Sequence, residues 1–563
     1  MKRWMMRLFA LALAAGFLAS TATMAQDAPK PADPDKKTES KPADSNTVTV
    51  GFEFEGLIFV QVKVNGKGPY KFLFDSGATQ SVLNARLATE LDLEQHDMPG
   101  GVQGVGTAEA KLVVLDSLEI GEFKRGECIA ASMNLDHMSG TLGYHMMGIV
   151  GQNIIKKMAK VEIDFGASKL GMTRYPEGEE PGDMQEEMLI RMLKGGGGIP
   201  GMPGMPGGKP DEGPKKDPKK DPKKDEDEFS LQPVGPSAAW LIQDGKSEAE
   251  ADRRSPTEGM TLTYRTGELN FFGRKMELVP YWYLDCVING KTKSFMFDTG
   301  ASMLLALGTK LADDLKLPTS FNYPVKGIGK GDAKSGMVDS FQVGVIKEVD
   351  VACTIMELPK ITDQLGEMGG MIPGVDKLNF DGIVGVTLAT RFKKMIVDAK
   401  EKHIEFIPYG KDEENKIDPF ASEDFVKDAV IRTWQGKAGK FSLSGDSVQL
   451  EDWKSKGLES GGLEVEAVDE GGAAAKAGIR KGDIITHLVG VAGDIPDDLE
   501  DADVDGNDVK VRDMPALIMW ACSQDPGKEV TVRLQRGKEQ LDVKVVLDNY
   551  GFSGAYPERF KGK

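Results

Sequence analysis

Two short apolar runs organise the hydrophobic pattern of this chain. Residues 72–74 (Phe-Leu-Phe) and 295–297 (Phe-Met-Phe) each have the length of a buried strand. The first run leads into Asp75-Ser76-Gly77 and the second into Asp298-Thr299-Gly300. In both copies the pattern predicts a buried strand that delivers an aspartate, a hydroxyl residue and a glycine into a turn, and such a turn makes an active-site loop.

The similarity between the two copies extends beyond these tripeptides. Asp298 follows Asp75 by 223 positions, and the same spacing separates Asp116-Ser117 from Asp339-Ser340. Asn-Gly dipeptides, which favour tight hairpin turns, lie at 65–66 and 289–290. Ile-Val-Gly recurs at 149–151 and 383–385, now 234 positions apart, which implies an insertion of 11 residues in the second copy. The chain therefore contains an internal duplication of a whole domain.

The chemistry of the repeated loop follows from its surroundings. A carboxylate beside an apolar layer is costly to ionise unless N–H groups or a hydroxyl satisfy it. Ser76 and Thr299 supply such hydroxyls, and Gly77 and Gly300 let the backbone approach closely. Two such carboxylates brought face to face share one proton, and the pair is then able to activate water and to protonate a leaving group.

On these residues the chain resembles the aspartic proteases, and it is more similar to the retroviral (retropepsin-like) type than to pepsin. The likeness covers residues 48–175 and 259–410. It implies a mainly β fold with two retropepsin-like closed β-barrel lobes, in which Asp75 and Asp298 form the catalytic dyad. Ser76, Gly77, Thr299 and Gly300 would support the two loops. Glycine-rich segments would form flaps over a peptide substrate, and they contain Gly104, Gly106, Gly327 and Gly329.

A second resemblance concerns the C-terminal part of the chain. An alternating stretch at 461–468 precedes the small-residue run 471–485, which predicts a strand, a tight helical turn and another strand. Residues 438–548 resemble the PDZ domains of exported bacterial proteases, which implies an α/β domain that captures a peptide by adding it to a sheet edge. Phe441 and Leu443 are the expected peptide-binding residues, in place of the usual Gly-Leu-Gly-Phe loop.

The rest of the chain is expected to direct export and to connect these domains. Residues 1–25 have a basic start, a short apolar run and a small final residue, which predicts a signal peptide with no stable membrane span after its cleavage. We expect a periplasmic or secreted protein. Residues 26–47 read as a disordered leader, and 176–258 as a flexible linker rich in glycine, proline and lysine.

Composition narrows the range of partners and cofactors. A net charge of −18 over 563 residues, with no basic groove signal, argues against nucleic acid. Five scattered histidines show no zinc spacing, so neither a metal site nor a cofactor is expected. The four cysteines have no close pairing in sequence, and we expect free, buried thiols. The expected partners are protein or peptide substrates and a peptide ligand of the PDZ domain.

The sequence leaves two alternatives open. A non-catalytic exported scaffold would keep the barrels and use the PDZ domain to recruit partners, since fold alone does not establish chemistry. In the other alternative, like lobes pair between two chains, because the long linker does not force the lobes of one chain together.

Overall fold

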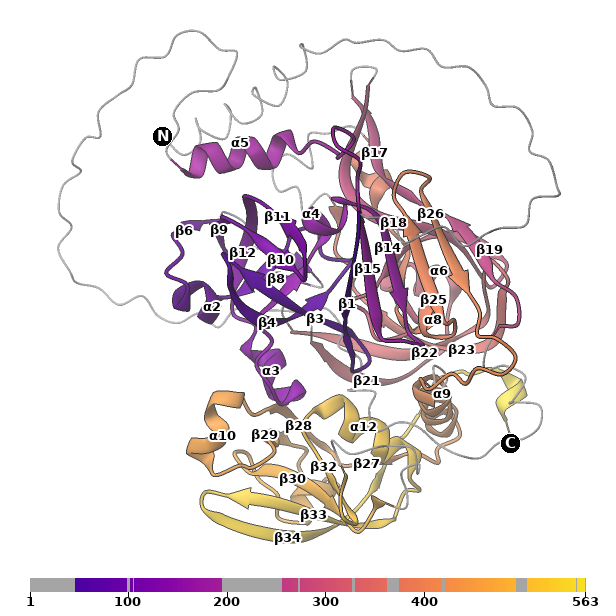
Figure 1. Ribbon diagram of the computed structural model, residues 1–563. Coiled ribbons are helices and arrows are strands. Elements are labelled where there is room, and N and C mark those ends of the chain that lie inside the picture. Colours follow the sequence, from indigo (N-terminus) through magenta and orange to yellow (C-terminus); the bar gives the residue numbers. More distant parts are fainter. Residues whose placement is uncertain are drawn as a thin grey trace.

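The structure is a computed structural model, and it describes residues 46–98, 102–104, 106–194, 256–271, 274–326, 330–361, 374–417, 421–492, 504–552 and 554–561. The expected signal peptide and nearly all of the expected leader lie outside the described residues. So do residues 195–255 of the expected linker, and Gly327 and Gly329 of the second expected flap. The described chain forms two β-rich lobes and a smaller C-terminal domain in chain order (Figure 1).

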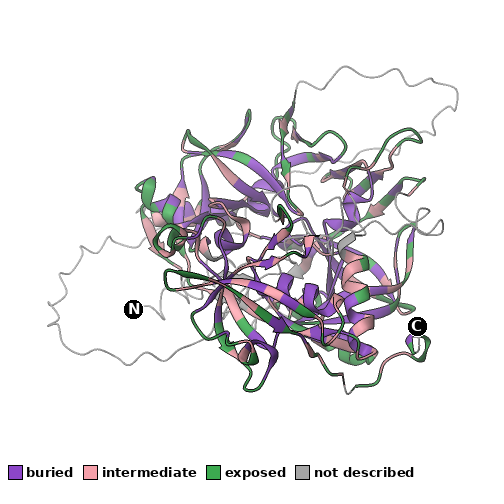
Figure 2. Cartoon of the chain, turned by 90° about the horizontal axis from the view of Figure 1, so that it is seen from below, coloured by how far each residue is buried: buried purple, intermediate pink, exposed green. Residues whose placement is uncertain are grey.

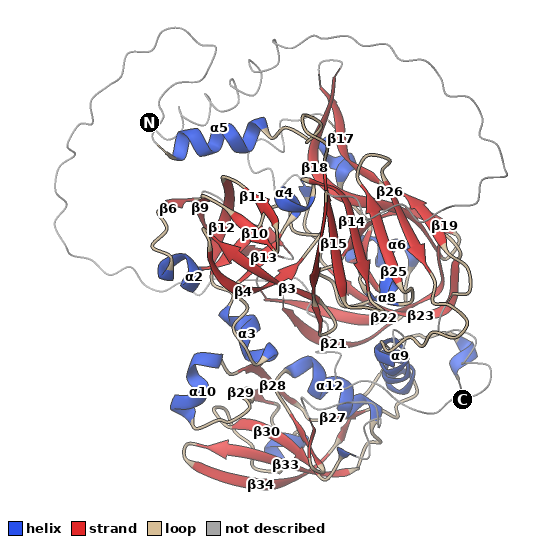
Figure 3. Ribbon diagram, in the orientation of Figure 1, coloured by secondary structure: helices blue, strands red, loops and turns tan. Residues whose placement is uncertain are grey.

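The first lobe consists mainly of strands, as the apolar runs predict (Figure 3). Its elements are β1 (Thr47–Gly51), β2 (Glu53–Phe54), β3 (Ile58–Val64), β4 (Lys67–Phe74), β5 (Val82–Asn84), α2 (Ala85–Glu90), β6 (Gln95–Asp97), β7 (Val102–Gly104), β8 (Gly106–Ala108), β9 (Lys111–Leu115), β10 (Leu118–Ile120), β11 (Phe123–Arg125), β12 (Cys128–Met133), α3 (Asp136–Leu142), β13 (Gly148–Val150), α4 (Gln152–Ile155), β14 (Met158–Asp164), β15 (Lys169–Arg174) and α5 (Met184–Leu193).

The second lobe repeats this arrangement with longer strands. Its elements are β16 (Met260–Thr263), β17 (Arg265–Phe271), β18 (Arg274–Ile288), β19 (Lys291–Asp298), β20 (Leu305–Gly308), α6 (Thr309–Leu315), β21 (Thr319–Lys326), β22 (Lys330–Val343), β23 (Ile346–Met356), the 3₁₀ helix η5 (Val375–Leu378), β24 (Gly382–Gly385), α8 (Thr387–Thr390), β25 (Lys394–Asp398) and β26 (His403–Ile407).

The duplication is visible in the strand pairing of the two lobes. In the first lobe β13 pairs parallel with β4 and antiparallel with β5. In the second, β24 does the same with β19 and β20. Both Asn-Gly dipeptides form tight turns between paired strands, with φ of 51° and 74° at Asn65 and Gly66 and of 47° and 76° at Asn289 and Gly290. The hairpin predictions are thus confirmed.

A sheet shared by both lobes lies between them. Its strand order is β1-β15-β14-β25-β26-β16, so strands from the two copies join at β14 and β25. These two strands are antiparallel, with Val161 opposite Val397. Lys394 strengthens the junction, since its Nζ lies 2.6 Å from Glu162 Oε1 and 3.0 Å from Asp164 Oδ2. The two lobes of one chain are therefore joined to each other through this sheet.

The linker prediction needs a correction at its start. Residues 176–194 are ordered, and α5 lies against the first lobe. The Asp183 side chain caps this helix by accepting from Glu186 N. Glu186 is buried, and its Oε1 accepts from the backbone N of Ile129 at 2.9 Å. Helix capping and one buried carboxylate thus order residues 176–194. The sequence analysis had included this segment in the linker because the residues that follow it are rich in glycine and proline.

The C-terminal domain begins earlier than expected and ends later. Its elements are α9 (Ala421–Trp434), β27 (Gly439–Lys440), β28 (Leu443–Ser447), α10 (Leu450–Lys456), β29 (Leu463–Val468), α11 (Ala473–Lys476), β30 (Ile484–Val489), β31 (Val504–Asp505), β32 (Asp508–Lys510), α12 (Met514–Ser523), β33 (Glu529–Arg536), β34 (Glu539–Val546), β35 (Asp548–Asn549) and the 3₁₀ helix η7 (Glu558–Phe560). In its main sheet β28 pairs with β29, and β33 pairs with β30 and β34.

The buried residues lie along strands and helices of the described chain, drawn purple in Figure 2. All four cysteines are buried and free, as expected, and burial raises the pKa of Cys128 and Cys353 to about 12. No helix among the described residues has both the length and the apolar character needed to cross a membrane.

Candidate active site

Both predicted aspartate loops leave buried strands. The aromatic side chains that precede them on β4 and β19 are fully buried, and their strands are covered by the parallel neighbours β13 and β24. Asp75 is 5% exposed and Asp298 is 0% exposed. Each of the two repeats therefore contributes one buried carboxylate. The sheet that the lobes share brings the two loops together.

The glycine of each loop lies against the aspartate of the other loop. Gly77 N donates to Asp75 Oδ1 at 2.7 Å and to Asp298 Oδ1 at 3.1 Å. Gly300 N donates to Asp298 Oδ1 at 2.7 Å. A Cβ built at Gly77 would lie 2.4 Å from Asp298 Cγ, and one at Gly300 would lie 2.4 Å from Asp75 Cγ. Only glycine fits at either position, and the two loops are related by approximate two-fold symmetry.

The hydroxyl residues lock the two loops together. Ser76 N donates to Thr299 Oγ1 at 2.9 Å, and Thr299 N donates to Ser76 Oγ at 3.0 Å. Each hydroxyl then donates across the interface, Thr299 Oγ1 to Phe74 O at 2.9 Å and Ser76 Oγ to Phe297 O at 3.2 Å. All four residues are buried, so this crossed network fixes the separation of the two carboxyls without help from solvent.

The electrostatics of the carboxyl pair are unequal. Burial raises the pKa of Asp75, although hydrogen bonds from Asp298, Gly77 N and Ala78 N oppose this effect. Burial, the negative charge of Asp75 and the hydrogen bond with it raise the pKa of Asp298 well above its usual range. Asp298 Oδ2 is buried and has no hydrogen-bond partner within the described part of the chain. The arrangement favours a pair of carboxyls that holds one proton between them.

A support that sequence reasoning missed lies directly after Ile149-Val150-Gly151. The side chain of Gln152 is buried, and its Nε2 donates to Ser76 O at 3.0 Å. Its neighbour Asn153 accepts from Ser81 N through Oδ1 at 2.8 Å. The repeated Ile-Val-Gly element marked this place in the sequence, and two polar residues directly after a buried strand were the available signal.

Of the two expected flaps, the first can be described. β7 and β8 form a hairpin in which Gly104 lies opposite Gly106. The second flap lies outside the described residues at its tip, and β21 and β22 pair on either side of it, up to Lys326 opposite Lys330.

The expected peptide-binding residues of the C-terminal domain are both buried. Phe441 stacks on Trp520 of α12, with ring centroids 6.1 Å apart, and Leu443 begins β28. Most side chains of α12 are buried as well. These two residues therefore contribute to the core of the domain, and the accessible part of β28 begins at Ser444, which is exposed.

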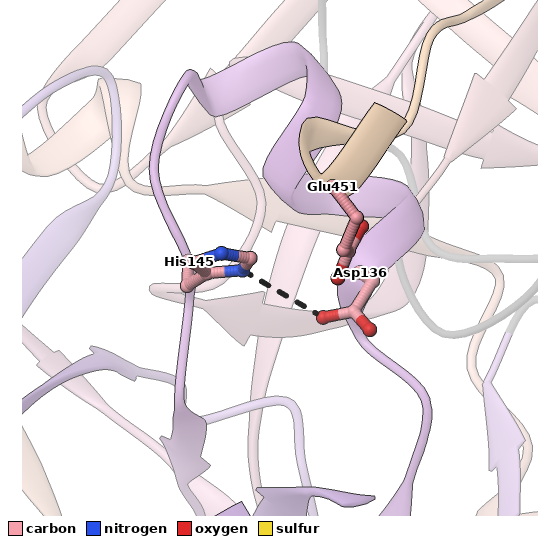
Figure 4. Close-up of side chains that lie close together, drawn as sticks. All are labelled: Asp136, His145 and Glu451. Atoms are coloured by element: carbon pink, nitrogen blue, oxygen red, sulfur yellow. Dashed lines mark ion pairs between the residues drawn. The ribbon is translucent and has the colours of Figure 1, made fainter. Parts of the chain in front are cut away.

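One group of possible metal ligands appears among the described residues, which the sequence had not predicted. Asp136 and His145 of the first lobe meet Glu451 of α10, with ligand atoms within 4.8 Å of one another (Figure 4). The guanidinium of Arg86 lies among them. Its Nη1 is 3.0 Å from His145 Nε2, and its Nη2 pairs with Glu451 and lies 4.0 Å from Asp136. An arginine thus supplies the positive charge that a metal would bring.

Comparison with known proteins agrees with the duplication. Residues 60–154 and 284–388 each match the family model described as aspartyl protease. No curated protein matches the chain. A retropepsin-like aspartic protease from Rickettsia conorii is 17% identical, with a TM-score of 0.17, over 23% of this chain and 90% of that one. Basic 7S globulin from soybean is 7% identical, with a TM-score of 0.26, over 64% of this chain and 96% of that one. Each lobe thus contains one region that is similar to the aspartyl protease family model.

Proposed function

We propose that this protein is an aspartic endopeptidase whose catalytic dyad, Asp75 and Asp298, forms within one chain. The reciprocal packing of the two loops carries the proposal, because each glycine approaches the opposite carboxyl so closely that no side chain fits between them. Matches to the aspartyl protease family in both lobes support it.

The hydrogen bonds of the two carboxyls support different roles for them. Asp75 accepts N–H donors from Gly77 and Ala78, which stabilise its ionised form. Asp298 carries the shared proton. A water molecule between them loses a proton to Asp75 as its oxygen attacks the peptide carbonyl, and the Asp298 proton stabilises the developing oxyanion. The proton taken up by Asp75 then passes to the leaving amine, which breaks the peptide bond.

The N-terminal segment and the C-terminal domain bear on where the protein acts and on what it binds. The basic and apolar N-terminal segment supports export to the periplasm or the exterior, and processing of the mature N-terminus between residues 20 and 30 would be seen by mass spectrometry of the exported protein. The C-terminal domain is proposed to be a PDZ domain that binds a peptide at the edge strand β28. A peptide library that fails to bind the full chain would count against that role.

The first test compares the wild type with Asp75→Asn and Asp298→Asn on casein and on a peptide library from pH 3 to 7. The proposal expects cleavage by the wild type and a loss of at least about 1,000-fold in each variant, because neither carboxyl has a substitute. Equal activity in either variant and the wild type would refute the dyad. Binding of partners without cleavage, unchanged in both variants, would favour the scaffold alternative.

A further inference from the structure

α3 contacts two parts of the molecule that are distant in the sequence, the apolar surroundings of Asp75 and the C-terminal domain (Figure 1). We propose that the C-terminal domain holds α3 in place and thereby positions the apolar cluster around the Asp75 loop, which we call the first-lobe wall. The C-terminal domain would in this way help to shape the substrate cleft. This inference rests on the proposed function, since it assigns the C-terminal domain a role in shaping that same site.

One face of α3 belongs to an apolar cluster around the aspartate loop. Met138 of α3 is 4% exposed and packs in this cluster. Leu73 of the cluster precedes Asp75 by two residues, and Ala78 donates its N–H to the Asp75 carboxylate at 3.0 Å. Ala108, from the first flap hairpin, packs against the same cluster. A displacement of α3 therefore reaches both the loop and the flap through side chains in contact.

The opposite face of α3 is fitted to the end of β28. A Cβ built at Gly140 would lie 2.5 Å from the carbonyl oxygen of Val448, so the helix and the strand end approach within a distance that only glycine allows. Beside this contact, the buried hydroxyls of Thr141 and Ser447 lie 3.0 Å apart in a hydrogen bond. A backbone contact of this kind fixes position more narrowly than contact between flexible side chains.

An ion pair completes the attachment. Arg86, from α2 of the first lobe, pairs with Glu451 of α10 and also contacts His145, which follows α3. Asn84 Nδ2 donates to Asp136 Oδ1 at 2.8 Å and so ties the start of α3 to the end of β5. We name the contacts of Arg86, Gly140 and Thr141 with Ser447, Val448 and Glu451 the clasp.

The C-terminal domain is also anchored to the second lobe by two hydrogen bonds. Trp434 Nε1 donates to Thr319 O at 2.9 Å, and Tyr550 accepts from Asn322 N at 3.1 Å. Both contacts lie on β21, the strand that runs toward the second flap. The domain therefore bridges the lobes, and the clasp sets the position of the first-lobe wall relative to the second lobe.

The decisive variant is Gly140→Ala in the full chain, compared with Gly126→Ala, whose added methyl group meets nothing within 4 Å. Alanine is the better helix former by about 1 kcal/mol, so on propensity alone the substitution would slow amide hydrogen exchange in α3. The clasp predicts the opposite sign. We expect exchange to become about tenfold faster in residues 135–146 and 73–83, a change equivalent to about 1.4 kcal/mol of opening free energy. Gly126→Ala should change neither segment.

Glu451→Gln is a second variant, and it leaves the sequence of α3 unchanged. We expect faster amide hydrogen exchange in the same two segments in this variant as well. Unchanged or slower exchange in residues 73–83 in both variants would overturn the proposal. This measurement does not require activity, so an inactive wild type would refute the protease proposal and not the clasp. With an active wild type, both variants should raise KM and leave kcat and its pH profile unchanged, whereas an unchanged KM would also refute the positioning role.

Discussion

At the residue scale, the site depends on four small or polar residues. They hold two carboxyls in buried surroundings where ionisation is costly. Each carboxyl depends on the other loop, because Asp298 accepts from Gly77 N and Asp75 lies against Gly300. The pKa of both carboxyls is raised by burial, and that of Asp298 also by its neighbour. The pair therefore costs stability at neutral pH, as expected of groups retained for chemistry.

Asp298→Asn is predicted to stabilise the protein at neutral pH. A raised pKa means that the folded state binds more protons than the unfolded state, so the stability contributed by this group falls as pH rises from about 4, the usual Asp pKa. The amide removes this loss, and its NH₂ group is able to donate to Asp75. Thermal unfolding should show a higher Tm than the wild type at pH 7 and convergence below about pH 3. A lower Tm for the variant at pH 7 would contradict the raised pKa.

Thr299→Val is predicted to destabilise the crossed hydroxyl network. Removing Oγ1 leaves Ser76 N and Phe74 O buried without partners, at a cost of about 1–3 kcal/mol for each group. Thr299→Ser is the matched control, because the first loop performs the same role with Ser76. Denaturant unfolding should therefore rank valine far below serine, and equal stability of the two variants would rule out this role for the hydroxyl.

At the element scale, β4 and β19 could be predicted from sequence because an apolar run ending in Asp-Ser/Thr-Gly is local. The Asn-Gly hairpins were predictable for the same reason, since two residues with positive φ determine the turn. The sequence could not predict α5, whose order depends on the contact of Glu186 with a backbone N–H that lies 57 positions away. The same holds for Gln152, since its role becomes visible only when the loop that it supports is in place.

Glu186→Ala is predicted to release α5 from the first lobe. The substitution leaves Ile129 N without its acceptor and Arg125 without the partner 3.2 Å from its Nη2. Limited proteolysis should then cleave between residues 176 and 194, which the wild type resists. The adjacent and exposed Glu187→Ala should behave as the wild type does. Resistance in both variants would mean that the buried carboxylate is not what holds the helix.

At the scale of the whole molecule, the shared sheet joins the two lobes through the pairing of β14 with β25. The sequence showed two matching lobes and left their pairing open, because neither motif contains information about β14 or β25. Those strands lie at the ends of the two repeats and finish at Asp164 and Asp398, which are 234 positions apart like the two Ile-Val-Gly elements. The position of the C-terminal domain was equally hidden, since its contacts with α3 and β21 involve no recognisable motif.

Cutting the linker is predicted to leave the lobes together. With an engineered cleavage site at Gly196–Gly198, the two fragments should remain associated through the β14–β25 pairing and the crossed hydroxyl network. Size-exclusion chromatography should show one species with the mass of the uncut chain. Separation into two fragments would mean that the linker, and not the shared sheet, holds the lobes together.

The shared sheet also bears on the order in which the protein is made. A nascent chain synthesised as far as residue 255 contains Asp75 but not its counterpart, and β14 has no strand to pair with on its free side. Such an edge is prone to pair with other chains. A ribosome must therefore add more than 140 further residues, through the end of β25, before this edge is covered. Under the proposed function, a chain that ends at residue 255 also lacks Asp298 and so holds only half of the dyad.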